Sequence, residues 1–310
     1  MMAQRGAFLP RSKLAWREAW AFYAFISPWI FGFLAFTLYP ILASFYYSLT
    51  QYDIVSPPRW MGAGNYRELF TDRLFWQSIK VTVYYTALSV PLGIAASLGL
   101  AVLLNQKVPA LSVFRTLYYL PSVITGVAVA LLFQWILNPD FGLVNYLLFK
   151  LFHVKGPGWF YDRYWAIPSF VLMSLWGLGG PMVIYLAALQ NVPTELYEAA
   201  ELDGAHALHR FRYVTLPMIS PVILFTFITG IIGSFQAFTQ IYVVTTGRGG
   251  PNYATLVYVL YLYQQAFRNF RMGFASAQAW ILFLIIFGLT LLALRASRRR
   301  VYYEAPTEAL

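Results

Sequence analysis

The sequence contains no cysteine, and charged residues make up only 11% of its 310 residues. The absence of cysteine excludes disulfides, thiolate metal sites and cysteine nucleophiles. Soluble domains have about a quarter of their residues charged, so this scarcity of charge, together with 59% hydrophobic residues, excludes an ordinary soluble protein. No GxxxxGKS/T phosphate loop is present, so the chain is not expected to bind ATP itself.

The few charged residues divide the chain into six long uncharged windows. Crossing about 30 Å of hydrocarbon takes about 20 residues, and each window is long enough to do so. We therefore predict an all-α membrane protein with six transmembrane helices, forming a single transmembrane domain over residues 1–310. The windows lie between Glu18 and Asp53, Lys80 and Lys107, Arg115 and Asp140, Arg163 and Glu195, Arg212 and Arg248, and Arg271 and Arg295.

Two windows need further interpretation. The first contains Pro28 and Pro40, which predict a tilted or kinked span. A seventh apolar segment, residues 249–267, has a core of only about half a span. We expect it to form a short helix at the outer membrane interface, with its tyrosines at headgroup depth. Six spans then place both chain termini in the cytoplasm.

Basic residues near the ends of spans indicate the orientation of a membrane protein. The predicted cytoplasmic segments hold 12 of the 22 basic residues, and the other segments hold 10. The totals do not decide the orientation, but the density at the two termini favours the cytoplasm. The cytoplasmic set is Arg5, Arg11, Lys13, Arg17, Lys107, Arg115, Arg210, Arg212, Arg295 and Arg298 to Arg300.

A polar segment, residues 191–221, separates two apolar windows in the second half of the chain. Thr194 is a candidate helix N-cap, because a side-chain oxygen there can accept from the first free amides. Gly204 falls where a short helix would need a residue that tolerates positive φ. A second short helix is expected over about residues 205–213, before Pro217 begins the next apolar segment. The segment therefore predicts a helix, a turn and a helix that project from the membrane.

These residues resemble the EAA signature of binding-protein-dependent ABC importer permeases. Two further segments extend the likeness toward the carbohydrate-uptake, maltose-permease-like branch. They are Arg115 to Leu117 with Leu120-Pro121, and Tyr242 to Thr245 followed by Gly249 to Pro251 and Thr255. The resemblance implies a type I ABC importer permease fold, in which residues 191–216 form a coupling loop that docks on an ATPase. The residues that carry this role are Glu198, Ala199, Ala200, Asp203, Gly204, Ala205, Phe211, Leu216 and Pro217.

The same resemblance implies the setting of the chain. It would be a multi-pass protein of the cytoplasmic (inner) membrane of a prokaryote, paired with a homologous second permease, two ATPase subunits and an extracytoplasmic solute-binding protein. ATP and Mg²⁺ would bind to the ATPase subunits, and no cofactor to this chain. The expected partners include the lipid bilayer but no nucleic acid. The sequence departs from the branch at Thr239, where an Asp is frequent, and by extra residues at 246–248.

The uncharged windows contain hydroxyl, amide and aromatic side chains but no ionisable acid, base or histidine. An ion-driven carrier usually places ionisable groups inside the bilayer, so a secondary transporter without an ATPase is disfavoured. Amides and hydroxyls beside aromatic faces suit a neutral sugar, oligosaccharide or polyol, whereas hydrogen bonding between helices would explain the same residues. Candidates for a substrate path are Trp176, Ser234, Phe235, Gln236, Phe238, Thr239, Tyr242, Ser276, Gln278 and Trp280.

Two alternatives to sugar transport stay open at this stage. Within the same family, glycerol phosphate or a polyamine is the main rival cargo. Enzyme chemistry is not expected, because no GxSxG elbow or other catalytic set is present. His206 and His209 lie three residues apart near Asp203, but no third ligand follows at metal-site spacing, so interface histidines are the favoured interpretation.

Overall fold

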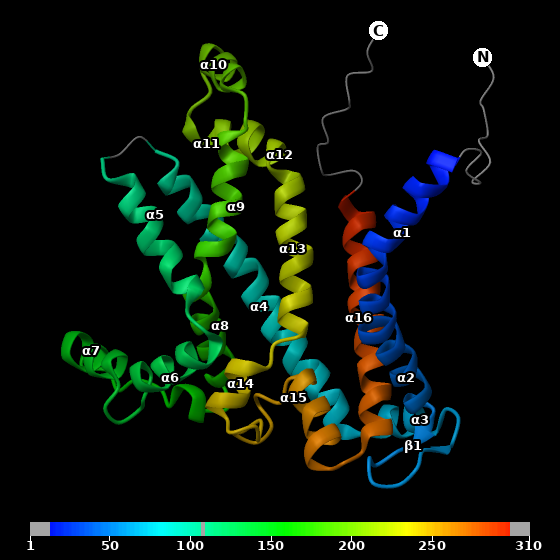
Figure 1. Cartoon of the computed structure of the whole chain (residues 1–310). Coiled ribbons are helices and arrows are strands. Elements are labelled where there is room, and N and C mark those ends of the chain that lie inside the picture. Colours follow the sequence, from blue (N-terminus) through cyan, green and yellow to red (C-terminus); the bar gives the residue numbers. More distant parts are fainter. Residues whose placement is uncertain (1–12, 107–108, 298–310) are drawn as a thin grey trace.

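The computed structural model describes residues 13–106 and 109–297, which are almost entirely helical (Figure 1). Four stretches are long and apolar enough to cross a membrane: Trp16–Ser48, Arg73–Leu104, Ser220–Val244 and Met272–Ser297. Two bent pairs complete the set: Leu111–Val123 with Gly126–Ile136, bent by 99°, and Ala166–Gly177 with Gly179–Gln190, bent by 53°. With each bent pair counted as one span, the described residues contain the six predicted spans.

The first half of the chain builds three of these spans and a small cap at the end of the bundle that carries α3. Its elements are α1 (Lys13–Phe33), a π-helical turn (Leu34–Leu38), α2 (Tyr39–Ser48), strands β1 (Thr50–Gln51) and β2 (Arg59–Trp60), α3 (Gly64–Thr71), α4 (Arg73–Leu104), α5 (Leu111–Tyr119), a 3₁₀ turn (Leu120–Val123), α6 (Gly126–Ile136) and α7 (Leu143–Phe152). The two strands pair antiparallel, with Thr50 opposite Trp60.

The second half builds the other three spans, the predicted coupling loop and the short helix α15. Its elements are a 3₁₀ turn (Trp159–Tyr161), α8 (Ala166–Ser174), a 3₁₀ turn (Leu175–Gly177), α9 (Gly179–Gln190), α10 (Thr194–Leu202), α11 (Ala207–Arg210), a π-helical turn (Phe211–Thr215), α12 (Leu216–Met218), α13 (Ser220–Phe235), α14 (Thr239–Val244), α15 (Tyr258–Tyr263), a π-helical turn (Gln264–Arg268) and α16 (Met272–Ser297).

Two of the π-helical turns lie directly before a proline. The Tyr39 amide donates to the Leu34 carbonyl just ahead of Pro40, and the Leu216 amide donates to the Phe211 carbonyl just ahead of Pro217. Proline has no amide hydrogen and its ring crowds the preceding turn, so a wider turn lets the helix continue past it. The predicted irregularity of the first span therefore occurs at residues 34–38, while Pro28 lies inside the continuous helix α1.

Helix α4 is the centre of the packing. It contacts α8, α9, α13 and α15 along its length and contributes to both hydrophobic clusters. The larger cluster includes Phe75, Phe170 and Tyr258 and lies toward the end of the molecule that carries α3 and α15. The smaller one joins Leu98, Met182 and Ile219 at the opposite end, next to the coupling loop. One long helix thus connects the two ends of the bundle.

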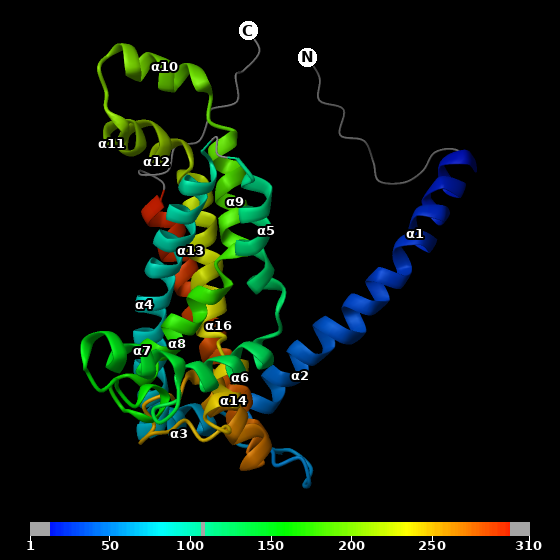
Figure 2. The same ribbon diagram turned by 90° about the vertical axis from the view of Figure 1, so that its left-hand side faces the viewer.

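The first span is the least covered part of the chain. None of its most apolar 18-residue window is buried, and the Phe25 side chain is 89% exposed. Figure 2 shows α1 leaning away from the other helices. The start of α1 and the end of α16 point toward the same end of the molecule as α10 (Figure 1). The side of the membrane on which the termini lie stays a prediction, and Arg5, Arg11, Lys107 and Arg298 to Arg300 lie outside the described residues.

The seventh apolar segment forms the predicted short helix, α15, but its first tyrosines are buried in the protein. In α15, Tyr258 and Tyr261 are 1% and 3% exposed. The Tyr258 hydroxyl donates to the Gln278 carbonyl at 2.8 Å, and the Tyr261 hydroxyl donates to the Asp72 carboxylate. Burial, together with that carboxylate, raises the pKa of Tyr261 well above its ordinary value, so the hydroxyl stays a donor. These polar groups find partners inside the protein, and the helix packs into the larger cluster, while its depth in the membrane stays a prediction.

The close approach of α9 to the end of α5 depends on a glycine. A Cβ atom at Gly179 would lie 2.4 Å from the Tyr118 carbonyl oxygen and 2.6 Å from the Tyr119 Cα, whereas one at Gly180 would meet nothing within 4 Å. We expect Gly179→Ala to lower the free energy of unfolding by about 1–3 kcal/mol, because two backbones would have to separate. Thermal unfolding of the purified protein in detergent, with Gly180→Ala as the matched control, measures this. Equal midpoints for the two variants would show that the contact is not tight.

Candidate functional site

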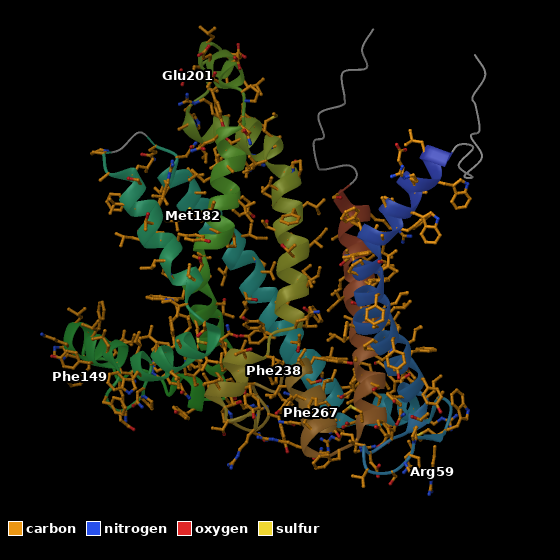
Figure 3. The ribbon with its side chains drawn as sticks, in the orientation of Figure 1. Arg59, Phe149, Met182, Glu201, Phe238 and Phe267 are labelled. Carbon is orange, nitrogen blue, oxygen red and sulfur yellow. The ribbon has the colours of Figure 1, made fainter. Side chains whose placement is uncertain are left out.

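The coupling loop projects from one end of the bundle. Helices α10 and α11 stand beyond the ends of α9 and α13 (Figure 1), and Glu201 lies near the tip (Figure 3). The loop is connected to these two spans through Asn191 and Met218. The loop is therefore a folded helical projection from the membrane domain and not an extended linker.

The turn at Gly204 has the geometry that the sequence predicts. Gly204 has φ +76°, and two amides close the end of α10, from Ala205 to the Ala200 carbonyl at 2.9 Å and from Gly204 to the Glu201 carbonyl at 3.0 Å. This pair is the Schellman arrangement, which favours glycine at the left-handed position. The predicted N-cap is wrong. Pro193 occupies the N-cap position, Thr194 is the first residue of the helix, and no side chain caps the helix start.

The second half of the loop is longer than predicted. It begins at Ala207 and continues through the π-helical turn of residues 211–215 to Met218, where a helix ending near Tyr213 was expected. The π-helical turn is the physical reason, because it carries the helix up to Pro217 without a break. Only Ile219 separates it from α13, so the loop and the fifth span are nearly continuous.

Polar contacts join the two halves of the loop to each other. The Tyr197 and Thr215 hydroxyls lie 2.9 Å apart, and Glu201 pairs with Arg210. Phe211 and Leu216 pack against the smaller hydrophobic cluster, which contains Leu104 at the end of α4. A force applied at the tip therefore reaches three spans through α4, α9 and α13.

The outer surface of the loop presents both predicted and unexpected residues. Glu198, Ala199 and Asp203 are exposed, while Ala200 and Ala205 are half-buried. The sequence interpretation missed the apolar side chains beside them, although leucines in a polar segment are a usable signal. Leu202, Leu208 and Tyr213 are 90%, 69% and 66% exposed. Exposed apolar residues within a charged rim are typical of a protein-binding surface.

A second feature is a cavity in the middle of the bundle, here called the transmembrane cavity. It consists of two adjoining pockets of about 220 and 240 Å³ that share Tyr85, Ser174 and Gly177. Three spans are interrupted beside it, at residues 120–125, 175–178 and 236–238. Residues from each interruption line the first pocket, including Ser122, Trp176 and Ala237. The breaks in three separate spans therefore converge on one cavity.

The lining of the transmembrane cavity is polar but uncharged. Tyr85, Ser122, Ser174 and Gln240 provide hydroxyl and amide groups, and Trp176 provides an aromatic face held edge-on by Phe133. The Gln240 amide faces Gly126, where a Cβ atom would lie only 3.0 Å from it. Within the described residues the Gln240 side chain has no hydrogen-bond partner. Tyr85, Ser122, Ser174 and Gln240 were not among the predicted path residues, because single polar residues within an apolar window give no indication of a shared cavity.

The predicted path residues divide into three groups. Trp176 and Ser234 line the transmembrane cavity. Phe235 is buried in the larger cluster, and Phe238 and Tyr242 stack on each other and on Tyr263 beside it, while Gln236 and Thr239 are exposed nearby. The α16 candidates lie away from the cavity: Ser276 and Gln278 are buried, and Trp280 contacts Phe45 and Phe283. The structure thus brings two of the ten to the cavity.

The two loop histidines contact each other. Their ring nitrogens approach to 2.6 Å, and both rings are exposed. Among the described residues there is no cluster of three or more histidine, aspartate or glutamate side chains that could hold a metal ion. Both rings therefore form part of the exposed surface of the loop.

Comparison with known proteins places this geometry in a family. Residues 82–301 match the model of the family described as binding-protein-dependent transport system inner membrane component. The chain is 41% identical over 302 residues to the probable ABC transporter permease protein YesP of Bacillus subtilis, covering 97% of each, and 38% identical to the lactose transport system permease protein LacF of Rhizobium radiobacter, covering 89% of this chain and 93% of LacF. A chain of the bacterial alginate ABC transporter, solved with an alginate pentasaccharide-bound periplasmic protein, has the same fold, with a TM-score of 0.82 and 24% identity. The match covers 96% of this chain and 100% of that chain.

The absence of cysteine makes the accessibility of the cavity measurable. We expect Ser174→Cys, on the cavity wall, to react with a water-soluble methanethiosulfonate, and Ser169→Cys, fully buried on the same helix, to react at least about tenfold more slowly, since only exposed thiols react readily. Mass spectrometry of the labelled protein gives both rates. Equal labelling would mean that water does not enter the cavity.

Proposed function

The chain belongs to the family of binding-protein-dependent transport system inner membrane components, and on that premise we propose that it moves a neutral sugar or short oligosaccharide across the membrane. It is a multi-pass transport subunit of an ABC importer, not a catalyst. The observation that carries the cargo proposal is the uncharged transmembrane cavity at the point where three spans are interrupted. Broken spans around a central cavity are the usual setting of a transport site.

The chemistry of the cavity supports a polyhydroxylated cargo. The Trp176 ring can pack on the CH face of a sugar, while the Gln240 amide and the Tyr85 hydroxyl can bond its hydroxyls. Glycerol phosphate would need cations in the lining and a polyamine would need carboxylates, and the described lining has neither. The lactose permease among the relatives supports the same choice.

The unburied first span supports pairing with a second permease. An apolar helix covered on no side must contact lipid or another protein, and α1 leans away from its own bundle. The surface of the coupling loop supports binding to an ATPase subunit. Its exposed Leu202 and Leu208 beside Glu198 and Asp203 suit a groove on an ATPase subunit, two of which would bind the ATP and Mg²⁺. The solute-binding protein would dock at the opposite end of the bundle.

The contacts suggest how the loop drives transport. When ATP closes the ATPase pair, the loop moves as one body, because the Tyr197–Thr215 and Glu201–Arg210 contacts join its halves. The smaller hydrophobic cluster carries this motion to α4, α9 and α13. Helices α4 and α13 and the turn before α9 also line the transmembrane cavity, so its opening changes from one side of the membrane to the other.

The test of coupling uses Gly204. We expect Gly204→Val to abolish ATP-driven uptake while the protein still inserts, because a β-branched residue at φ +76° is strained by about 1–3 kcal/mol. No atom within 4 Å blocks a Cβ there, so the effect comes from the backbone alone. Gly204→Asn is the matched control, since asparagine tolerates the left-handed region, and it should retain most uptake. Uptake and ATP hydrolysis are measured in proteoliposomes of the whole complex. Full transport by the valine variant would contradict the coupling role of this turn.

The cargo site has its own test. Trp176→Ala and Gln240→Ala should each reduce sugar uptake by about tenfold or more, because each loses roughly 1–2 kcal/mol of ligand contact. Gln51→Ala, at an exposed position of β1 outside the transmembrane cavity, is the control. Uptake of radiolabelled lactose and arabino-oligosaccharides is compared at equal ATPase assembly. Unchanged uptake in both variants would place the cargo elsewhere.

A further inference from the structure

A separate cavity at the end of the bundle opposite the coupling loop is lined by basic and aromatic side chains. It has a volume of about 610 Å³ and is called the outer cavity here. Arg73 and Lys80 come from α4, Arg163 from the segment before α8, and Tyr253 from the segment before α15. No acidic residue lines it; the remaining lining residues are Leu74, Trp76, Gln77 and Asn252.

The positive charge of the outer cavity is not neutralised by the described part of the protein. Within residues 13–106 and 109–297, the side chains of Arg73, Lys80 and Arg163 make no ion pair or hydrogen bond, and all three are exposed. The nearest carboxylates in sequence are engaged elsewhere. Asp72 caps α4 through the Leu74 amide at 2.8 Å and accepts from Tyr261, and Asp162 accepts from the Tyr164 amide at 2.7 Å. Within the described residues, the three basic side chains around the outer cavity therefore have no carboxylate partner.

The outer cavity is on a different side of α4 from the transmembrane cavity. Arg73, Trp76, Gln77 and Lys80 follow helical spacing on one face. Tyr85, which lines the transmembrane cavity, projects about 120° around the helix from Arg73, at roughly 100° per residue. The unpaired cations therefore do not face the path proposed for the sugar.

The face of α4 beyond the outer cavity is apolar and uncovered. Val83 and Tyr84 are 47% and 48% exposed, and Ala87 and Pro91 are exposed one and two turns further along. Arg73 to Lys80 spans about 10 Å of helix, and Lys80 is the last charged residue before the apolar span. The cations therefore lie at the depth of lipid headgroups, with an apolar strip directly below them.

We propose that the outer cavity binds a membrane phospholipid. Its phosphate lies among Arg73, Lys80 and Arg163, its headgroup contacts Trp76 and Tyr253, and an acyl chain follows the strip from Val83 to Pro91. Charge complementarity and the continuity of the cavity with an exposed apolar face favour a lipid over a soluble anion. An anionic headgroup without a cation of its own, such as phosphatidylglycerol, satisfies the three charges best.

Native mass spectrometry of the purified complex, titrated in detergent with dioleoylphosphatidylglycerol and dioleoylphosphatidylcholine, tests the proposal. We expect Arg73→Gln with Lys80→Gln and Arg163→Gln to weaken phosphatidylglycerol binding by about tenfold or more and to abolish the preference over phosphatidylcholine. The matched control neutralises Arg59, Arg67 and Lys150, which do not line the outer cavity, and should bind like the unaltered chain. Arg73→Lys with Arg163→Lys keeps the charge and should restore binding, which separates charge loss from misfolding.

Two results would overturn the proposal. One is an unchanged phosphatidylglycerol affinity in the neutralised variant that assembles normally. The other is binding of inorganic phosphate at least as tightly as phosphatidylglycerol, because the site would then belong to a soluble anion. Neither result bears on the sugar uptake measured through Trp176 and Gln240, so the two proposals fail independently.

Discussion

Hydrocarbon offers no hydrogen-bond partner to an exposed backbone group, and this constraint governs where the spans can be interrupted. Helices α5 and α6, α8 and α9, and α13 and α14 are each separated by a short non-α-helical segment. All three breaks adjoin the transmembrane cavity, where protein and solvent can satisfy the freed groups. Helix α4, which lines the cavity with side chains, and α16, which does not, continue for 32 and 26 residues without a gap. Non-helical backbone within these three spans is therefore tolerated beside the cavity.

The coupling loop and the transmembrane cavity are mechanically linked because they share helices. Ile219 belongs to the cluster beneath the loop, and Ser234, at the other end of α13, lines the cavity. Between them the Thr226 hydroxyl bonds the Tyr185 hydroxyl of α9. This contact therefore joins the two spans between the coupling loop and the transmembrane cavity. The buried polar pair makes relative sliding of α9 and α13 costly, since separation would leave both hydroxyls unpaired.

The sequence predicted features that depend on composition and local backbone, and it failed for features that depend on neighbours. Charge-free windows located six spans, because a charge in hydrocarbon is costly wherever it lies. The turn at Gly204 was predictable, since few other residues adopt its φ. Burial of Tyr258 was not, because an apolar helix has the same pattern whether it faces lipid or protein. The Thr82 hydroxyl that accepts from the Tyr258 amide at 2.8 Å lies 176 residues away.

The same limit applied to the cavity residues. Trp176 and Ser234 were predicted from their chemistry, but Tyr85 and Gln240 are united with them only by the way α4, α8 and α14 meet. The residues of α16 were chosen by the same reasoning about polar groups, and they instead pack against α15 and other helices. The one-domain organisation over residues 1–310 and the cytoplasmic location of both termini stay predictions.

The charge-free lining has an electrical consequence. Moving one elementary charge across a membrane potential involves about 2.3 kcal/mol per 100 mV. The described walls of the transmembrane cavity carry no charge, and a neutral cargo adds none. If the cargo is the neutral sugar proposed above, each transport cycle moves no net charge through this cavity, and uptake would then depend on ATP and not on the membrane potential.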